Sequence, residues 1–270
     1  MTSAYSDILQ RIEAAIGDAR SVFARFTPGA IDAEFKAGHD PVTEADRAID
    51  TVLRQNLLRD GEGWLSEESV DDFSRLEKSR VWVVDPLDGT REFVKGIPEF
   101  CVSIGYVEKG RPVAGGIHNP ATNETFIGAI DMGVLYNGQP AISSQRTQLQ
   151  GAVTLASRSE VKRGEWKTFE NGPLHIRAMG SVAYKLALVS AGLADITFTL
   201  TPKNEWDVAA GAALVLSSSG FLGTLNGSTF RANSRDPLLS GLIASGPQLR
   251  DELLKLLEPH LQPAPQRFEK

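Results

Sequence analysis

The sequence has a single cysteine and no long apolar run, and both features limit the classes of protein to which it can belong. Its one cysteine, Cys101, excludes an internal disulfide and a multi-cysteine zinc site, and we interpret it as a buried packing residue. The longest apolar stretch, Val208 to Leu216, is far shorter than the ~20 residues of a membrane span. The N-terminus carries Asp7 and Glu13 and lacks the apolar segment of a signal peptide. We therefore expect a cytoplasmic protein with no membrane contact.

Charge and motif content exclude further classes. The net charge of −6 argues against binding to a nucleic-acid polymer but allows a small anionic ligand. Neither a P-loop nor a Gly-x-Gly-x-x-Gly fingerprint is present. The four histidines fall outside the motifs discussed below, and we expect surface or structural positions for them: His39, His118, His175 and His260.

Residue periodicity predicts the first half of the fold. Apolar residues at helical spacing predict an amphipathic helix over residues 4–26. Thr43, followed by Asp46, resembles a capping box and predicts the start of a second helix. Strands are expected from Val81 to about Ile142, with residues 102–107 and 112–117 forming a hairpin. Two further strands are expected at 124–129 and 134–136.

In the second half of the sequence, strand patterns alternate with helix patterns. The polar segment 143–151 predicts a boundary between two halves. Strands are predicted at 153–156, 196–200 and 242–244, and helices at 181–191, 207–216 and around 249–257. We expect a mixed α/β layer and a mobile tail over 262–270.

The segment Asp85-Pro-Leu-Asp-Gly-Thr90 is the most informative motif. It follows the apolar run 81–84, which predicts a buried strand, so two carboxylates three residues apart follow a strand end. Such a motif is a simple turn or, because α/β folds place ligands at strand ends, part of a site. Carboxylates beside a hydroxyl and backbone amides can hold hard divalent cations and phosphate.

Two other acidic sites are excluded by spacing. An EF-hand loop starting at Asp85 would need a ligand at its third position and Glu at its twelfth, where Leu87 and Gly96 stand. A phosphatase with an aspartyl nucleophile would show Asp-x-Asp-Gly-Thr, whereas Asp85 and Asp88 are separated by two residues. Asp46, Glu67 and Asp207, each taken alone, are typical of helix caps or solvated acids.

Taken together, the acidic motifs resemble those of the inositol monophosphatase superfamily. The four matching segments occur in the family's order: Pro41-Val-Thr-x-Ala-Asp46, Ser66-Glu-Glu-Ser69, Asp85-Pro-Leu-Asp-Gly-Thr90 and Trp206-Asp-x-Ala-Ala-Gly211. The resemblance implies an α/β (α+β) fold, a layered α-β-α-β-α sandwich. Residues 1–150 would form an N-terminal half with a mainly antiparallel sheet and most metal ligands. Residues 151–270 would form an α/β half of the same catalytic unit.

The resemblance also implies the ligands of two or three Mg²⁺ ions. Glu67, Asp85 and the Leu87 carbonyl would hold one ion, and Asp85, Asp88 and Asp207 a second. A third, weaker ion would be coordinated mainly by Glu67. Either Thr90 paired with Asp46, or Glu67, would activate the attacking water. Lys36 resembles a family lysine near the metals, or is a solvated lysine.

Substrate contacts follow from the same resemblance. Asp88, Gly89, Thr90, Gly180, Ser181, Lys185 and Asp207 would contact the substrate, with the Gly89 and Thr90 amides on phosphate oxygens. Inositol-specific members carry an acid seven residues before the last Asp, where this chain has Leu200. Gly89-Thr-Arg-Glu-Phe93 and Lys185 resemble the CysQ-type 3′(2′),5′-bisphosphate nucleotidases. Lys185 is either a phosphate contact or a solvated helix residue.

We thus expect a Mg²⁺-dependent, Li⁺-sensitive phosphomonoesterase acting on a small phosphorylated metabolite. A CysQ-like nucleotidase is favoured over an inositol-1-monophosphatase or a broad sugar-phosphate phosphatase. The resemblance suggests a homodimer. Some family members also act as regulatory partners of the transcription machinery, but a non-catalytic role predicts the loss of a metal-binding acid, and all are present.

Overall fold

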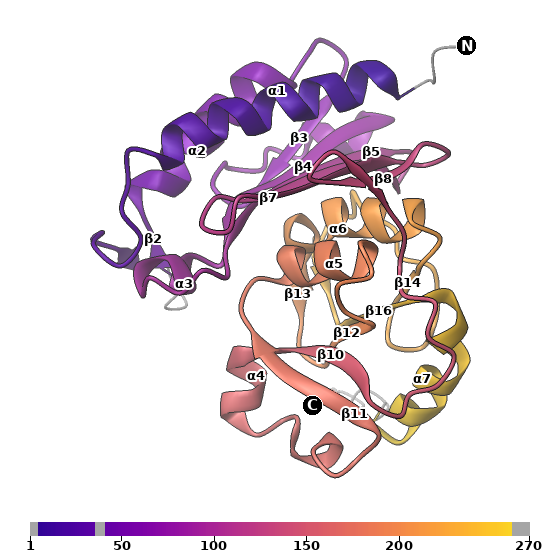
Figure 1. Cartoon of the computed structure of the whole chain (residues 1–270). Helices are drawn as coiled ribbons and strands as arrows, with labels where there is room; N and C mark the ends of the chain where they lie inside the picture. Colours follow the sequence, from indigo (N-terminus) through magenta and orange to yellow (C-terminus); the bar gives the residue numbers. More distant parts are fainter. Residues whose placement is uncertain (1–4, 36–40, 261–270) are drawn as a thin grey trace, which may run out of the picture.

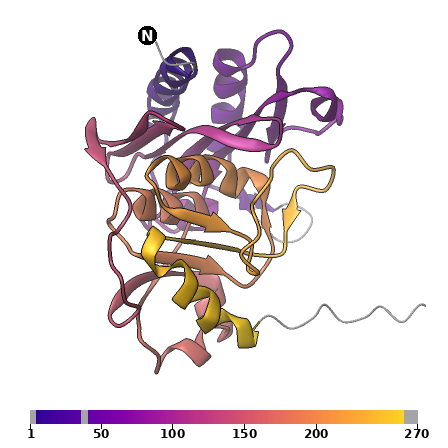
Figure 2. The same ribbon diagram turned by 90° about the vertical axis from the view of Figure 1, so that its right-hand side faces the viewer.

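Two large β-sheets and three helical layers form the body of the described structure (Figure 1). The computed structural model describes residues 5–35 and 41–260. From top to bottom in Figure 1, α1 and α2 cover a seven-stranded sheet, α5 and α6 lie beneath it, and a five-stranded sheet separates them from α7. The rotated view in Figure 2 shows the same order of layers. The predicted α-β-α-β-α sandwich is therefore confirmed.

The first helical layer follows the predicted apolar spacing. Helix α1 (Ser6–Phe23) buries the face that carries Ile12, Ile16 and Ala19, within the predicted range 4–26. Helix α2 (Glu44–Leu57) is capped by Thr43, whose side chain and that of Asp46 form the predicted capping box. Both helices pack on the outer face of the larger sheet because they share one apolar cluster with it.

The seven-stranded sheet has the order β3-β4-β5-β6-β7-β8-β9. Strands β3 and β4 are parallel, and every later pair is antiparallel. The predicted hairpin is formed by β5 and β6. The bounds are β3 (Gly63–Ser66), β4 (Arg80–Asp88), β5 (Cys101–Glu108), β6 (Arg111–Asn119), β7 (Glu124–Ala129), β8 (Gly133–Tyr136) and β9 (Gln139–Ala141).

The middle layer, α5 (Val182–Ser190) and α6 (Glu205–Ser217), packs very closely on this sheet. The middle of helix α6, residues 209–213, consists of small buried residues, because the helix lies between both sheets. A Cβ atom on Gly115 of β6 would lie 2.4 Å from the Ala210 carbonyl oxygen of α6. The glycine therefore permits the close approach of helix and sheet.

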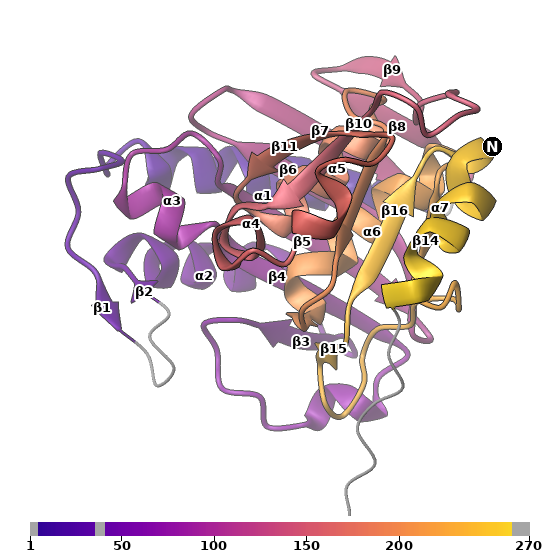
Figure 3. The same cartoon turned by 90° about the horizontal axis from the view of Figure 1, so that it is seen from below.

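The five-stranded sheet has the order β11-β10-β12-β16-β14. Its outer face packs on α7 (Arg250–Leu257) and on aromatic residues that follow α4 (Arg158–Arg163), among them Trp166 and Phe169. Seen from below, α3 (Thr90–Val94) and α7 lie at opposite ends of the molecule (Figure 3). The strands are β10 (Ala152–Ser157), β11 (Leu174–Met179), β12 (Ile196–Thr199), β14 (Phe221–Gly223) and β16 (Leu242–Ser245).

Short elements complete the fold, and most were not anticipated from periodicity because two to four residues carry too little pattern. Two-residue strands pair as β1 with β2 and β13 with β15. These are β1 (Glu34–Phe35), β2 (Pro41–Val42), β13 (Lys203–Asn204) and β15 (Leu238–Leu239). In the part of the chain that the structure describes, 3₁₀ turns lie at Ser74–Glu77, Lys167–Phe169, Pro247–Leu249 and Glu258–His260.

The larger sheet takes its strands from residues 63–141 and the smaller from 152–245. The division of the chain into halves at residue 150 stays a prediction, as does the mobility of the tail 262–270, which lies outside the described residues. Within residues 5–35 and 41–260, no helix combines the length and apolarity needed to cross a membrane.

The close contact of α6 with the sheet gives a stability prediction. Gly115→Ala should destabilise the protein by about 1–3 kcal/mol, because the new methyl group overlaps the Ala210 carbonyl. Gly17→Ala is the matched control, since a Cβ there meets nothing within 4 Å. The control should be neutral or stabilising by up to about 1 kcal/mol. Chemical denaturation measures both, and equal stability of the two variants would contradict the packing argument.

Candidate active site

A pocket of about 300 Å³ lies where the end of β4 meets the starts of α3, α5 and α6. The residues just before and within α4 complete its wall. Helices α3 and α4 lie on the left-hand side of the molecule in Figure 1, and β13 lies between them and α6. The motif 85–90 supplies five of the lining residues: Asp85, Leu87, Asp88, Gly89 and Thr90.

An irregularity in β4 brings both acids of this motif to the pocket. Asp85 pairs with Ser103 and Asp88 with Cys101, so three steps on β4 match two on β5. In a regular strand, residues three apart point to opposite faces, and a bulge of one residue corrects this. The Asp85 carboxylate also accepts a hydrogen bond of 2.9 Å from the Leu87 amide, which fixes the turn.

Three carboxylates meet at the centre of the pocket. Glu67, Asp85 and Asp207 each offer an oxygen atom within 4.8 Å of the other two. Glu67 follows β3, which runs parallel to β4, and Asp207 lies in the first turn of α6. Asp207 accepts a hydrogen bond of 3.0 Å from the Asn204 amide. The fold thus joins acids that are far apart in the sequence.

Burial and mutual repulsion disfavour the ionised form of these acids. Burial, followed by the charges of Glu67, Asp88 and Asp207, raises the pKa of Asp85 well above its usual value. Burial and the neighbouring Asp88 and Glu67 do the same for the pKa of Asp207. A bound cation reverses this cost, and a donor set made of carboxylate oxygens fits a hard divalent ion such as Mg²⁺. The residues present therefore fit the expected metal.

Asp88 stands beside the three acids, held by α5. Its Oδ2 atom accepts hydrogen bonds from the Ser181 hydroxyl at 2.7 Å and from the Ala183 amide at 2.6 Å. Burial raises the pKa of Asp88 despite these bonds. Asp88 is thus the link between the acidic cluster and the start of α5.

Thr90 connects the metal-site loop with Asp46. Its hydroxyl lies 2.9 Å from the Leu87 carbonyl oxygen and 3.1 Å from Asp46 Oδ1. The other oxygen of Asp46 accepts from the Thr43 amide at 2.7 Å and from the Thr43 hydroxyl at 2.6 Å. Burial raises the pKa of Asp46, although the bonds from Thr43 and Thr90 act against it.

Two glycines shape the pocket wall. Gly89 has a left-handed backbone, with φ of 100°, and a Cβ there would lie 2.7 Å from the Glu99 carbonyl oxygen. A Cβ on Gly180 would lie 2.4 Å from the Glu92 carboxyl carbon, so Glu92 occupies the space above it. These contacts explain why glycine stands at both positions.

The interpretation of Lys185 as a solvated residue is wrong. The side chain is buried, and its ammonium donates a hydrogen bond of 2.9 Å to the carbonyl of Ser181, the residue directly before α5. Burial lowers the pKa of Lys185 to about 8. Lys185 lines the pocket together with Gly180 and Ser181.

Other residues singled out by the sequence lie elsewhere. Leu200 is half-buried, packs on the apolar cluster of the smaller sheet and does not line this pocket. His118 is structural: it is buried between Arg20 and Thr125, and burial lowers its pKa to about 4. Lys36 and His39 lie outside the described residues.

Several pocket residues were not found from the sequence. Arg158 and Lys203 line the pocket from segments without a recognised motif, and Glu92 lies in the Gly89-Thr-Arg-Glu-Phe93 segment but was not named as a site residue. Two donors in its wall, Arg158 Nε and Trp206 Nε1, are buried and have no acceptor among residues 5–35 and 41–260. The position of Lys203, directly before the Trp206-Asp207 motif, was the one available signal. The wall opposite the acids is therefore rich in donors.

Comparison with known proteins places this geometry in a family. Residues 6–262 match the inositol monophosphatase family, so the chain belongs to it. It is 32% identical to the "fructose-1,6-bisphosphatase/inositol-1-monophosphatase" of Thermotoga maritima over 81% of this chain and 82% of that protein. It is 29% identical to the "Nus factor SuhB" of Escherichia coli, covering 89% and 91% of the two chains.

The fold comparison agrees. The solved inositol monophosphatase of Thermotoga maritima superposes with a TM-score of 0.81 at 28% identity, covering 94% of this chain and 97% of the other. The protein is accordingly a phosphatase, a phosphoric monoester hydrolase.

The crowding of buried acids predicts an unusual stability effect. In metal-free buffer at neutral pH, Asp85→Asn should raise the Tm, because the amide keeps the acceptor for Leu87 but removes a buried like charge. Since folding raises the pKa of Asp85, the cost of its ionised form vanishes as the pH falls below the folded-state pKa. The Tm difference should therefore shrink on acidification.

Thermal denaturation with and without Mg²⁺ checks this prediction. Magnesium should raise the Tm of the wild type more than that of Asp85→Asn, since a ligand stabilises the state that binds it. Asp18→Asn, on the exposed face of α1, is the matched control and should behave like the wild type. A metal-free Tm of Asp85→Asn below that of the wild type would contradict the repulsion argument.

Proposed function

We propose that this protein is a Mg²⁺-dependent phosphomonoesterase that hydrolyses a small phosphorylated metabolite, with 3′(2′),5′-bisphosphorylated nucleotides as its favoured substrates. The observation that supports the metal chemistry most strongly is the meeting of Glu67, Asp85 and Asp207 in one pocket. The preference for a bisphosphate is supported by basic side chains in the same pocket: Arg91, Arg158, Lys185 and Lys203.

In this proposal five groups hold two or three Mg²⁺ ions: Glu67, Asp85, the Leu87 carbonyl, Asp88 and Asp207. When bound, the ions lower the pKa of a water molecule and stabilise the leaving oxygen. The Thr90 hydroxyl lies 2.9 Å from the Leu87 carbonyl oxygen, so Thr90 lies beside this group. The Gly89 and Thr90 amides, with Gly180 and Ser181, bind phosphate oxygens and the rest of the substrate.

We favour Thr90 with Asp46 over Glu67 for activating the water. The Thr90 hydroxyl has one hydrogen and two neighbouring acceptors, the Leu87 carbonyl and Asp46. If it donates to Asp46, its oxygen can accept a hydrogen bond from water and pass the proton on. Glu67 already belongs to the acidic cluster, where a cation would occupy its lone pairs. Asp46 does not line the pocket and stays available as the final acceptor.

The substrate preference rests on charge. Five acidic and four basic side chains line the pocket, so any bound divalent cation makes its total charge positive. A positive pocket favours a substrate with more than one anionic group. The names of the relatives fit the alternative, an inositol-1-monophosphatase or a sugar-phosphate phosphatase, as well. A transcription-linked role like that in the name of SuhB is a lesser candidate, because the intact acidic cluster favours catalysis.

Metal removal tests the proposal as a whole. Phosphate release from 3′-phosphoadenosine 5′-phosphate should require Mg²⁺, stop in excess EDTA and be inhibited by Li⁺. The wild type should also prefer this substrate to inositol 1-phosphate in kcat/KM. Full activity in EDTA would contradict the metal mechanism. A preference for the inositol ester above about tenfold, or roughly 1.4 kcal/mol, would contradict only the substrate class.

The role of Thr90 can be tested separately. Thr90→Val keeps the shape but removes the hydroxyl, so kcat should fall about 10²- to 10⁴-fold, as for loss of a proton-transfer group. Thr90→Ser should retain most activity. Thr51→Val, which removes an exposed hydroxyl from α2, is the matched control. Asp46→Asn combined with Thr90→Val should be little worse than either alone, and fully multiplicative losses would show that the two do not act together. A homodimer, suggested by the family, stays a prediction.

A further inference from the structure

We propose that Lys203 binds the second anionic group of a bisphosphorylated substrate, and that Glu160 is the positioning residue that holds the Lys203 side chain for this contact. The inference rests on the proposed function and assigns its substrate class to particular residues. Neither residue belongs to the motifs that define the family resemblance.

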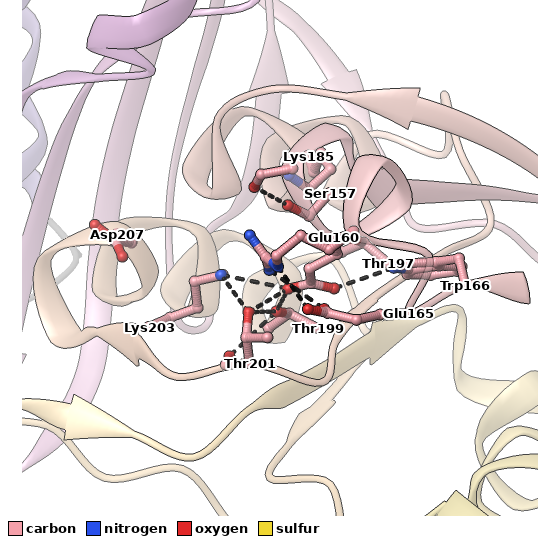
Figure 4. A network of polar contacts seen from close by, with 12 residues as sticks. Ser157, Glu160, Glu165, Trp166, Lys185, Thr197, Thr199, Thr201, Lys203 and Asp207 are labelled. Atoms are coloured by element: carbon pink, nitrogen blue, oxygen red, sulfur yellow. Dashed lines mark hydrogen bonds and ion pairs between the residues drawn. The ribbon is translucent and has the colours of Figure 1, made fainter. Parts of the chain in front are cut away.

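Glu160 is a buried carboxylate with an unusually complete set of partners (Figure 4). Its Oε2 atom accepts from the Trp166 indole at 3.1 Å. Its Oε1 atom accepts from the hydroxyls of Thr199 and Thr201, and the Lys203 ammonium lies 3.3 Å away. Burial alone would raise the pKa of Glu160, but these hydrogen bonds and the Lys203 charge lower it. Glu160 is therefore a fixed negative charge beneath the pocket wall.

Three partners of Glu160, all except Trp166, come from one short segment. Thr199 ends β12, Lys203 begins β13, and Thr201 lies in the bend between them, so the three alternate along the chain. Their contacts with Glu160 show that all three side chains face it. Lys203 donates to the Thr201 hydroxyl at 2.9 Å, and Thr201 donates to Glu160 at 2.6 Å. This chain of bonds holds the lysine through both neighbours.

Lys203 lies where its ammonium group can contact a ligand in the pocket. Lys203 lines the pocket, four residues before Asp207, and 15% of its side chain is exposed. Figure 4 shows the side chain extending from the segment that leads to Asp207 towards Glu160 and Thr201. An ammonium has three hydrogens, and these two neighbours account for two of them. The third remains available for a ligand oxygen.

Other features of the wall agree with an anionic ligand. Arg158, at the start of the helix that carries Glu160, has a buried Nε without a hydrogen-bond acceptor in the described ranges 5–35 and 41–260, although its guanidinium is paired with Glu99 and lies 3.9 Å from Glu92. Trp206, which lines the same pocket, also has a buried ring nitrogen, Nε1, without a hydrogen-bond acceptor in these ranges. Lys185 is a weaker candidate than Lys203 because it is 3% exposed and donates to backbone carbonyls. Lys203 is thus better placed than Lys185 to contact the second anionic group.

The test compares two substrates that share the reacting ester: 3′-phosphoadenosine 5′-phosphate and adenosine 3′-monophosphate. The readout is the ratio of their kcat/KM values, measured at saturating Mg²⁺. Lys203→Met keeps the aliphatic stem and removes the charge. The ratio should fall about 10- to 100-fold, as for loss of a hydrogen bond to a charged group, mainly through KM for the bisphosphate. Lys162→Met, an exposed lysine on α4, is the matched control and should leave the ratio unchanged.

Glu160 is tested through its effect on Lys203. Glu160→Gln should lower the same ratio, and in combination with Lys203→Met it should add little, because both changes remove one contact. Should Glu160→Gln fold poorly, Thr201→Val removes the bridging hydroxyl while leaving both charges in place. Circular dichroism and the Tm check the fold of each variant.

The outcomes separate the two proposals. Wild-type turnover without any dependence on Mg²⁺ overturns the proposed function. Normal metal-dependent turnover with an equal loss for both substrates in Lys203→Met, or with no loss, overturns this inference alone and leaves Lys203 as a structural partner of Glu160. A wild type that prefers the monophosphate overturns it as well. A selective fall of the ratio supports it.

Discussion

Repulsion among buried and half-buried carboxylates is the constraint on which the site depends. Glu67, Asp85 and Asp207 lie within 4.8 Å of one another, and Asp88 raises the pKa of both aspartates further. Burying like charges costs several kcal/mol per ion unless they are compensated. The rest of the fold must therefore hold these acids together against their own electrostatics, which favours a rigid scaffold over a flexible loop.

That rigidity comes from a helix packed unusually close to a sheet. Helix α6 carries Asp207 at its start, and its small residues approach the glycines of β5 and β6. A Cβ on Gly105 would lie 2.8 Å from the Ala210 amide nitrogen, and one on Gly115 would overlap the Ala210 carbonyl. Since β4 pairs with β5, the same contact fixes Asp207 relative to Asp85. Packing far from the pocket thus sets the geometry of the acids.

The sequence predicted the regular parts of this fold and the acidic half of the pocket. Helices α1 and α2, the β5–β6 hairpin and the Thr43–Asp46 capping box follow from periodicity and local hydrogen bonding, which are properties of neighbouring residues. The site residues required the joint order of four motifs. Strands of two to four residues, such as β3 and β13, were not predicted, because so few residues show no reliable hydrophobic period.

Most of the basic wall could not be predicted, for a different reason. The sequence left open whether Lys185 contacts phosphate or is solvated, because its burial arises from the crossing of α5 beneath β4 and β5. Lys203 and Glu160 are 43 positions apart and meet because β10 and β12 are adjacent parallel strands. Contacts of this kind depend on sheet order, which local patterns do not encode.

The two walls of the pocket are nevertheless joined by one stretch of chain. This stretch, residues 199–207, runs from the end of β12 to the first turn of α6, where Asp207 lies in the acidic cluster. On the way, its residues Thr199, Thr201 and Lys203 contact Glu160. A shift of this segment would move Lys203 and Asp207 together, because the amide of Asn204, which follows Lys203, donates to the Asp207 carboxylate. Substrate selection at the basic wall and cation binding at the acidic wall therefore share a single support. The buried Glu160 fixes one end of that support, and the Asn204–Asp207 capping box fixes the other.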